Sequence, residues 1–398
     1  MSKLEELIQQ YCPDGVEWKT LGEATIMKRG TSATKGIMQE GNIPVISGGR
    51  QPAYYCNISN RTGEVITVAG SGAGAGYVQY WNEPIFVCDA FSIQGNETLK
   101  TKYVYYVLSS IQEKIYSTKK GGGVPHVHIS SIGKFEIPVP PLPVQEEIVR
   151  ILDTFTELQA ELQAELQKRK QQYNYYLDNL LSFNDINRGG QAEVRWMKMS
   201  DIGTFYSGLS GKTKEDFQNG NAKFISYMNI FNNPSLITDV DDRVKILEGE
   251  KQNTIQYGDL LFTGSSETPD ECGMCSVLTH HTEEKLYLNS FCFGFRFNDL
   301  SGINPEFMKF LFRSSVIRKL ICKTANGVTR FNISKKEFAK IVIPIPSLAE
   351  QDHIASVLDK FYFLVGDLTA GLPAEIEKRR QQYEYYRDKL LTFKRKGA

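Results

Sequence analysis

The sequence lacks an excess of charge of either sign, a long apolar run and a paired cysteine pattern. Lys plus Arg and Asp plus Glu number 46 each, so any surface for a polyanion has to be local. No run approaches the roughly 20 apolar residues that cross a bilayer, and the opening MSKLEELIQQY is charged and helical, unlike a signal peptide. The seven cysteines are odd in number and scattered, as expected of reduced thiols. We therefore expect a soluble, cytoplasmic protein without a membrane partner.

Two glycine-rich segments come close to nucleotide-binding motifs, but neither is complete. GSGAGAGYVQYW from Gly70 follows a strand-like run, yet aromatics and Pro84 follow it where an amphipathic helix would have to face a pyrophosphate. GLSGKT from Gly208 ends like a phosphate-binding loop, but Tyr206 occupies the position of the required first glycine. We expect neither segment to bind a cofactor.

Metal-ligating and catalytic residue types are present without the spacing that their chemistry requires. His126 and His128 share one face of a strand-like segment, but no nucleophile or carboxylate at matched spacing accompanies them. A zinc site would need the lone CxxC and the Cys and His residues that follow it, namely Cys272, Cys275, His280, His281 and Cys292. A single CxxC without a second pair is weak evidence, and no NPPY-like methyltransferase motif appears. We therefore predict no catalytic residue, cofactor or metal in this chain.

The chain contains a long internal sequence repeat. IPVPPLPVQEEIVRILDTF from Ile137 aligns without a gap with IPIPSLAEQDHIASVLDKF from Ile343, which pairs Gln145 with Gln351. Further on, KRKQQYNYYLDNLLSF is matched by KRRQQYEYYRDKLLTF near the C-terminus. Between these anchors the two halves diverge strongly, so each half consists of a variable domain, a proline-rich strand and a long helix.

The variable parts, about 15–135 and 194–340, favour strands. Short β-branched or aromatic runs alternate with Gly, Asn and Pro: VITVAG, YVQYW, IFVC, KFISYMNIF, DLLFTG and FCFGFRF. Late in each part, KYVYYVLSSIQEKIYS and NPEFMKFLFRSSVIRKLI carry apolar residues at helical spacing. We expect two mostly β domains, each with one late helical stretch.

The repeated segments predict long helices. An apolar stripe from 144 to 183 keeps one face over forty residues, or roughly 60 Å, and the second copy does the same, so the two would bury one another as an antiparallel coiled coil. TELQAELQAELQ from Thr156 repeats every four residues, a unit that adds length with about 40° of drift in the buried face. Pro373, close to Gly371, should kink or split the second helix.

A variable β-rich domain, an IPxPPLxxQ strand leading into a long helix, and a QQYxYYxDxLL ending, all repeated, resemble the specificity subunit of type I restriction-modification systems. The resemblance covers nearly the whole chain, including CPDGVEWKTLGE from Cys12. It implies an α+β, pseudo-twofold protein of a bacterial cytoplasm. The expected parts are a first target recognition domain (1–143), a central spacer helix (144–190), a second recognition domain (191–349) and a C-terminal spacer helix (350–398).

The resemblance also implies partners. Such a subunit binds a split site in double-stranded DNA and recruits two modification (methyltransferase) subunits, which use S-adenosylmethionine, and restriction subunits, which use ATP and Mg. A coiled-coil scaffold that docks proteins rather than DNA is the alternative that the sequence leaves open.

We expect DNA contacts from polar and basic loop residues, because these side chains reach phosphates and base edges. In the first domain the candidates are Lys28, Arg29, Ser47, Arg50, Gln51, Ser71, Lys119, Lys120 and His126. In the second they are Ser207, Lys212, Tyr227, Asn229, Ser265, Ser266, Asn326, Thr329 and Arg330.

Overall fold

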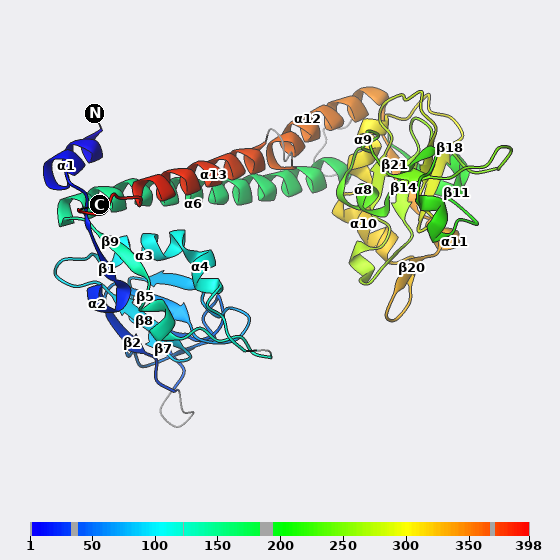
Figure 1. The fold of residues 1–398 in the computed structure, drawn as a ribbon. Coiled ribbons are helices and arrows are strands. Elements are labelled where there is room, and N and C mark those ends of the chain that lie inside the picture. The colour runs from blue at the N-terminus through cyan, green and yellow to red at the C-terminus, as the bar shows by residue number, and fades with distance from the viewer. Residues whose placement is uncertain (1, 33–38, 122, 184–193, 367–370, 398) are drawn as a thin grey trace. The chain divides into compact units, whose positions relative to one another are not determined.

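The computed structural model describes residues 2–32, 39–121, 123–183, 194–366 and 371–397 (Figure 1). The chain forms two compact units: unit 1 is Met1–Ala164 with Glu375–Ala398, and unit 2 is Glu165–Ala374. Within the described ranges, no helix combines the length and the apolar character that a membrane crossing demands.

Unit 1 is built on a four-stranded antiparallel sheet in the order β2-β8-β5-β6. Its central strand β5 is buried on both faces, which explains why VITVA is continuously apolar. A three-stranded sheet, β4-β3-β7, and the ladder β1-β9 complete the β structure. The strands are β1 (Glu17–Thr20), β2 (Ile26–Arg29), β3 (Ile43–Ile46), β4 (Tyr54–Cys56), β5 (Val65–Ala69), β6 (Val78–Trp81), β7 (Phe86–Val87), β8 (Ala90–Gln94) and β9 (Glu136–Val139).

Short helices close the core of unit 1. The expected late helix is present and breaks at Ile111 into two pieces, α3 and α4. Tyr103 and Tyr106 of α3 are buried among the apolar side chains of the four-stranded sheet. The helices are α1 (Lys3–Tyr11), α2 (Leu21–Ala24), α3 (Thr101–Ser110), α4 (Gln112–Tyr116) and α5 (Ile129–Ile132).

Unit 2 repeats this topology strand for strand. Its four-stranded sheet has the order β11-β18-β14-β16, its three-stranded sheet the order β13-β12-β17, and its two-stranded ladder is β10-β21. In both units the three-stranded sheet contains one parallel pair, β3-β7 in unit 1 and β12-β17 in unit 2. The strands are β10 (Arg195–Lys198), β11 (Gly203–Ser207), β12 (Ala222–Ile225), β13 (Arg243–Val244), β14 (Leu260–Thr263), β16 (Cys275–Val277), β17 (Leu286–Leu288), β18 (Cys292–Phe297) and β21 (Val342–Ile345).

The helices of unit 2 match those of unit 1, with additions. The second late helical stretch is again two pieces, α9 and α10. Unit 2 adds the helix α8 and a small sheet, β15-β20-β19. These elements are α7 (Met199–Ile202), η1 (Lys214–Phe217), α8 (Tyr227–Asn232), β15 (Ser265–Ser266), η2 (Pro269–Glu271), α9 (Pro305–Leu311), α10 (Ser315–Cys322), β19 (Ala325–Asn326), β20 (Phe331–Ile333) and α11 (Lys335–Phe338).

The expected mixture of helices and sheets in two related units is confirmed, but one predicted strand is partly wrong. KFISYMNIF is a strand only in its first half, and YMNIF forms α8. Six residues are too few to show helical periodicity in a sequence, and short helices depend on tertiary contacts for their stability. The remaining strand-like runs form strands.

The long helices are α6 (Leu142–Leu181), α12 (Leu348–Gly366) and α13 (Leu372–Leu390). The split expected at Pro373 is confirmed, since α12 ends before Gly371 and Pro373 lies in the first turn of α13. In unit 1, Phe155 of α6 stacks on Tyr386 with ring centroids 5.6 Å apart. In unit 2, Tyr176 of α6 stacks on Phe361 at 4.9 Å. The antiparallel coiled coil as a spacer stays a prediction, as do the expected domain boundaries.

The two aligned glutamines explain why the repeated segment is so similar. Gln145 is fully buried, donates from Nε2 to the carbonyls of Thr98 (2.9 Å) and Pro140 (2.7 Å), and accepts from the backbone N–H of Lys100 (2.8 Å). Gln351 makes the equivalent bonds in unit 2, to the carbonyls of Gly302 and Pro346 and from the N–H of Asn304. Each glutamine thereby ties the long helix to the loop before the late helical stretch.

Candidate nucleic-acid interface

In unit 1 the structure gathers most of the predicted residues on three adjoining segments. A narrow hairpin joins Lys120 to His126 through two backbone hydrogen bonds of 2.9 and 2.8 Å. Its second arm pairs with Ser71, at the start of the glycine-rich loop that links β5 and β6. The loop after β3, which carries Ser47, Arg50 and Gln51, approaches closely: a Cβ on Gly48 would lie 2.2 Å from the Ser71 carbonyl oxygen.

The glycines of this region allow two backbone segments to pack closely. The segment after the loop is strand β6, antiparallel to β5, so no helix N-terminus faces the loop. A Cβ on Gly74 would lie 2.5 Å from the Gly48 carbonyl oxygen, which only a glycine avoids. The loop consequently holds two candidate recognition segments against each other.

Basic side chains of unit 1 lie on the surface of this region. The Arg50 guanidinium is 5.1 Å from the Tyr77 ring centroid, and the Lys119 ammonium is 4.1 Å from that of Tyr116. Lys28, Arg29, Gln51, Lys120 and His126 are exposed, and Ser47 and Ser71 are half-buried. Arg29 and His126 also line a hollow of about 230 Å³ together with Asp89, whose carboxylate accepts from the Ser71 hydroxyl.

Unit 2 carries the same three segments in a more regular form. The hairpin here is β19-β20, in which Asn326 pairs with Asn332, and β20 also pairs with β15 at Ser265. The segment after β12, the strand equivalent to β3, is the helix α8, which begins at Tyr227. Figure 1 shows the hairpin beside β20 extending from the body of the unit.

These segments of unit 2 enclose a cleft of about 560 Å³. Tyr227 donates its hydroxyl to the Ser265 carbonyl (2.8 Å), and Arg330 donates from Nε and Nη2 to the Ser265 hydroxyl at 3.2 and 3.1 Å. Burial raises the pKa of Tyr227, so its hydroxyl stays protonated and a donor. The lining residues are Tyr227, Met228, Phe231, Ser265, Ser266, Glu267, Glu271, Phe291, Thr329 and Arg330.

The helix α8 is fixed from behind by a buried arginine. Arg313 donates from Nη2 to the carbonyls of Ile230 (2.9 Å) and Phe231 (3.0 Å), and from Nε to the carbonyl of Cys275 in β16 (2.7 Å). Burial lowers the pKa of Arg313, yet the guanidinium stays charged at neutral pH because its ordinary pKa is above 12. A positive charge at the C-terminal end of a helix also favours the helix dipole.

Other predicted residues of unit 2 lie outside the cleft or have structural partners. Asn229 uses both side-chain atoms on the backbone of Ile237, donating to its carbonyl (2.8 Å) and accepting from its N–H (3.2 Å). Ser207 is exposed at the end of β11, and its carbonyl accepts from Asn253 (3.0 Å). Asn326 is exposed on the hairpin. Their contact with DNA stays a prediction.

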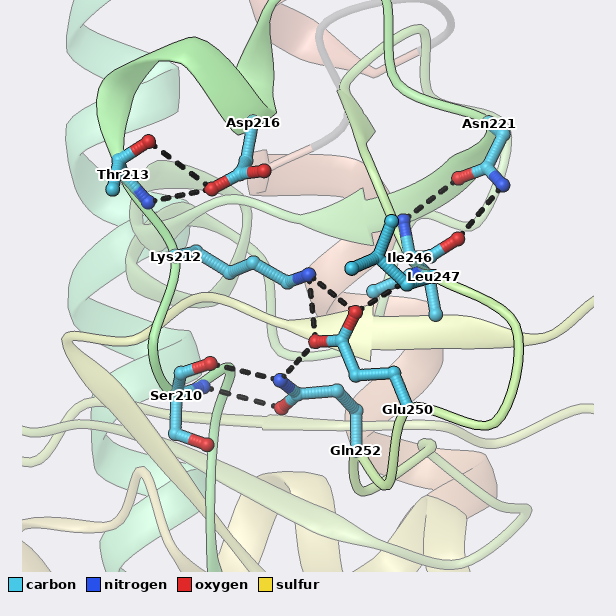
Figure 2. A network of polar contacts seen from close by, with 9 residues as sticks. All are labelled: Ser210, Lys212, Thr213, Asp216, Asn221, Ile246, Leu247, Glu250 and Gln252. Atoms are coloured by element: carbon cyan, nitrogen blue, oxygen red, sulfur yellow. Dashed lines mark hydrogen bonds and ion pairs between the residues drawn. The ribbon is translucent and has the colours of Figure 1, made fainter.

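Lys212 is a poor candidate for a phosphate contact, because its charge is already neutralised inside unit 2 (Figure 2). Its side chain is only 6% exposed, and its Nζ lies 2.6 Å from the carboxylate of Glu250. Glu250 also accepts from the Leu247 backbone N–H (2.8 Å) and from Gln252 (2.7 Å). These contacts, that of Leu247 first, hold the pKa of Glu250 at about 2. The GLSGKT segment is therefore part of a structural network.

Sequence reasoning missed the apolar and acidic side chains of the cleft. Phe291 is 59% exposed and Met228 55%, and both line the cleft. Both belong to runs that read as core strands, FCFGFRF and KFISYMNIF, so their composition concealed their position. The sequence around Glu267 and Glu271 has no pattern that marks a cleft, and acidic side chains are not expected on a surface that meets phosphates.

The cysteines of the candidate zinc site are packed inside unit 2. Cys272, Cys275 and Cys292 are buried, and burial raises the pKa of Cys275 and of Cys292 to about 12. Burial among apolar side chains therefore keeps both thiols protonated at neutral pH. Across the described ranges, no group of three or more His, Cys, Asp or Glu side chains is arranged to hold a metal ion.

Comparison with known proteins assigns the chain to a family. The model of the type I restriction modification DNA specificity domain matches it twice, at residues 13–169 and 192–378. The chain is 30% identical to the specificity subunit of the Escherichia coli type I restriction enzyme EcoR124I/EcoR124II, over 99% of this chain and 97% of that protein.

Solved structures show the same fold. One is the type I restriction-modification S subunit from M. genitalium, with a TM-score of 0.54, 17% identity, and coverage of 94% of this chain and 95% of that one. Another comes from a study of complex assembly and conformational transition of the type I system, with a TM-score of 0.59, 16% identity, and coverage of 95% and 98%. From the double match to the family model and the full-length relative, we conclude that this chain belongs to the family of type I restriction-modification DNA specificity subunits, which are non-catalytic.

Proposed function

We propose that the chain reads a bipartite DNA site, one half through unit 1 and the other through unit 2, and recruits modification and restriction subunits to it. The observation that carries this proposal is the repetition of three adjoining segments in both units. Each unit has a hairpin, a segment that follows its central strand (β5 or β14), and a segment that follows β3 or its equivalent β12. Family membership supplies DNA as the partner.

The loops are suited to reading different sequences. Unit 1 presents Arg50, Lys119 and Lys120 around a glycine-rich loop, whereas unit 2 presents a cleft with aromatic, acidic and arginine side chains. Basic side chains outside such a cleft position a protein on phosphates, and donors and acceptors inside it contact base edges. Two half-sites of different sequence are the expected target.

The long helices would set the distance between the half-sites. Supporting this, α6 is continuous from Leu142 to Leu181 and contributes to both units, and in each unit it stacks on a helix from the C-terminal end of the chain. The exposed tyrosines of these helices, Tyr175 and Tyr385, are 65% and 63% exposed and occupy equivalent positions of the repeat. We assign them to the surface that contacts the partner subunits.

The four-residue repeat within α6 allows a direct test of the proposal that helix length sets the distance between the half-sites. Deleting Glu161–Ala164, one Glu-Leu-Gln-Ala unit, shortens the helix by about 6 Å and keeps its buried face within about 40°. With base pairs about 3.4 Å apart, the unread spacer of the site should shorten by at most about two base pairs while both half-sites stay the same. Replacement of the same four residues by alanines is the length-preserving control. A deletion variant that methylates sites of unchanged spacing would contradict the proposal that helix length sets the spacing.

The chemistry belongs to partner subunits in this proposal. The methyltransferase subunits would bring S-adenosylmethionine, and the restriction subunits ATP and magnesium. In this chain the two segments that come closest to nucleotide-binding motifs have other contacts. Lys212 is paired with Glu250, and the loop that starts at Gly70 packs on the backbone of the loop after β3.

The deciding experiment is to co-express the chain with the methyltransferase encoded beside it and to map methylated adenines by long-read sequencing. A split motif of two short half-sites, present only when both proteins are present, is the expected result. A stable complex with an active methyltransferase but without a split motif would contradict DNA readout and favour a protein-docking scaffold.

A further inference from the structure

The cleft of unit 2 contains one guanidinium that is oriented but not neutralised. Arg330 is exposed, and its Nε–Nη2 edge donates to the Ser265 hydroxyl oxygen at 3.2 and 3.1 Å. The guanidinium lies 5.5 Å from the centroid of the Phe291 ring, over its face. Among the described residues no carboxylate lies within ion-pair distance of Arg330.

Ser265 itself is held on two sides, so it fixes the direction of the guanidinium. It is buried in the short strand β15, which pairs with β20, and its carbonyl accepts from Tyr227. With the Nε–Nη2 edge engaged, Nη1 and the second N–H of Nη2 have no acceptor within the described part of the chain. These N–H groups form the end-on edge of the guanidinium, a rigid fork of two parallel donors.

One of the two acidic residues of the cleft is equally informative. Glu267 lines the same cleft, and no hydrogen bond or ion pair to its carboxylate is present among the described residues. A carboxylate on a surface that meets DNA is repelled by the phosphates. It is favourable there only if it accepts a hydrogen bond, and cytosine N4 is the base-edge donor that Glu and Asp contact in the major groove.

We propose that this cleft reads a G·C pair in the half-site bound by unit 2: the end-on edge of Arg330 donates to O6 and N7 of guanine, and Glu267 accepts from N4 of cytosine. This deepens the proposed function and rests on it. Guanine presents two adjacent acceptors in the major groove, which match the two free donors of the fork, whereas adenine presents a donor beside its one acceptor. Phe291 excludes water on one side of the guanidinium and strengthens the contact.

The test compares methylation motifs made by complexes of the full chain with its methyltransferase. In Arg330→Ala one guanine position of one half-site should lose its preference, while the other half-site keeps its sequence. The expected loss of discrimination at that position is about 5- to 150-fold, the range for one bidentate contact. Arg330→Lys keeps the charge but not the rigid planar fork, so it should retain methylation and lose part of the discrimination. Glu267→Gln should relax the preference at the same base pair.

Lys251→Ala is the matched control, because it removes one exposed positive charge of unit 2 outside the cleft. It should leave the motif unchanged. Thermal unfolding and co-elution with the methyltransferase identify any variant that fails to fold, in which case Arg330→Lys carries the test.

The outcomes separate the two proposals. If the wild-type complex methylates a split motif and both Arg330 variants keep every guanine of it, the reading by Arg330 is wrong and the proposed function stands. If the motif has no G·C pair in the half-site that unit 2 reads, the inference is likewise overturned. If the active wild-type complex yields no split motif, the proposed function fails and the inference fails with it.

Discussion

The two units share a framework and differ in the segments that would face DNA. Strand order, the parallel pair in the small sheet and the glutamine that ties helix to loop recur in both units. By contrast, unit 1 has an irregular loop after β3 and only a single backbone pairing at Ser71, whereas unit 2 has α8 and a three-stranded sheet at the same places. Framework contacts are thus repeated where their role is structural, and the segments between them are free to diverge.

The largest expected effect tests the shared framework. Gln145→Ala and Gln351→Ala each leave two carbonyls and one N–H without their partner, and unsatisfied buried groups cost about 1–3 kcal/mol apiece. We expect each variant to lose about 3 kcal/mol of unfolding free energy, and only in its own unit. Urea unfolding followed by hydrogen exchange in each unit measures this.

Gln163→Ala, an exposed glutamine on α6, serves as the control and should stay within about 0.5 kcal/mol of the wild type. Equal destabilisation of both units by Gln145→Ala would show that the framework contacts are not local to one unit.

The two glutamines show how much of the fold can be predicted from the sequence alone. The repeat made Gln145 and Gln351 equivalent at once, and the alternating or apolar runs predicted most strands, because these patterns are local. The carbonyl partners of the glutamines are brought together only by folding. The same holds for α8, whose last carbonyls accept from Arg313, over 80 positions away, and for Lys212, which Glu250 neutralises from 38 positions away. Long-range contacts leave no periodic trace in a sequence.

Arg313 tests the difference between the units, since it holds an element that unit 1 lacks. Arg313→Met keeps the apolar packing but removes three hydrogen bonds from a charged donor to carbonyls. Bonds of this kind contribute about 1.5–3 kcal/mol each, but water can reach part of the freed backbone, so we expect a loss of about 2 to 3 kcal/mol in unit 2.

Hydrogen exchange at the amides of α8 should accelerate more than at those of β14. The methylated DNA motif should lose sequence preference only in the half-site bound by unit 2. Unchanged protection of α8 would mean that its other contacts suffice to hold it.

A third difference concerns pH. Glu147 of unit 1 is buried beneath Arg150 and Lys3, at a position where unit 2 has His353. The hydrogen bond from Arg150 first, and then that from Lys3, lower the pKa of Glu147 from 4.5 to about 2. The folded state therefore binds this proton less readily than the unfolded one, so the stabilisation is full above pH 4.5 and is lost as pH falls toward 2.

Glu147→Gln should accordingly destabilise unit 1 at pH 7 and reduce the pH dependence of its unfolding between these values by up to about one proton. Acid titration of unfolding at fixed urea concentration, followed separately in each unit, checks this. If the unfolding free energies of the wild type and of Glu147→Gln differed by the same amount at every pH, the effect would come from packing.

The smallest effect sharpens the comparison on the long helices. Phe155–Tyr386 in unit 1 and Phe361–Tyr176 in unit 2 are equivalent stacked pairs, each at 22° between ring planes, with centroids 5.6 and 4.9 Å apart. Aromatic pairs of this geometry contribute about 0.5–1.5 kcal/mol beyond their buried area. Double-mutant cycles with leucine should give coupling energies in that range for both pairs, the larger one for Phe361–Tyr176 because its rings are closer. Coupling near zero in one unit only would mean that the helix contact is specific to the other, and that the repeat on α6 no longer has the same structural role in both units.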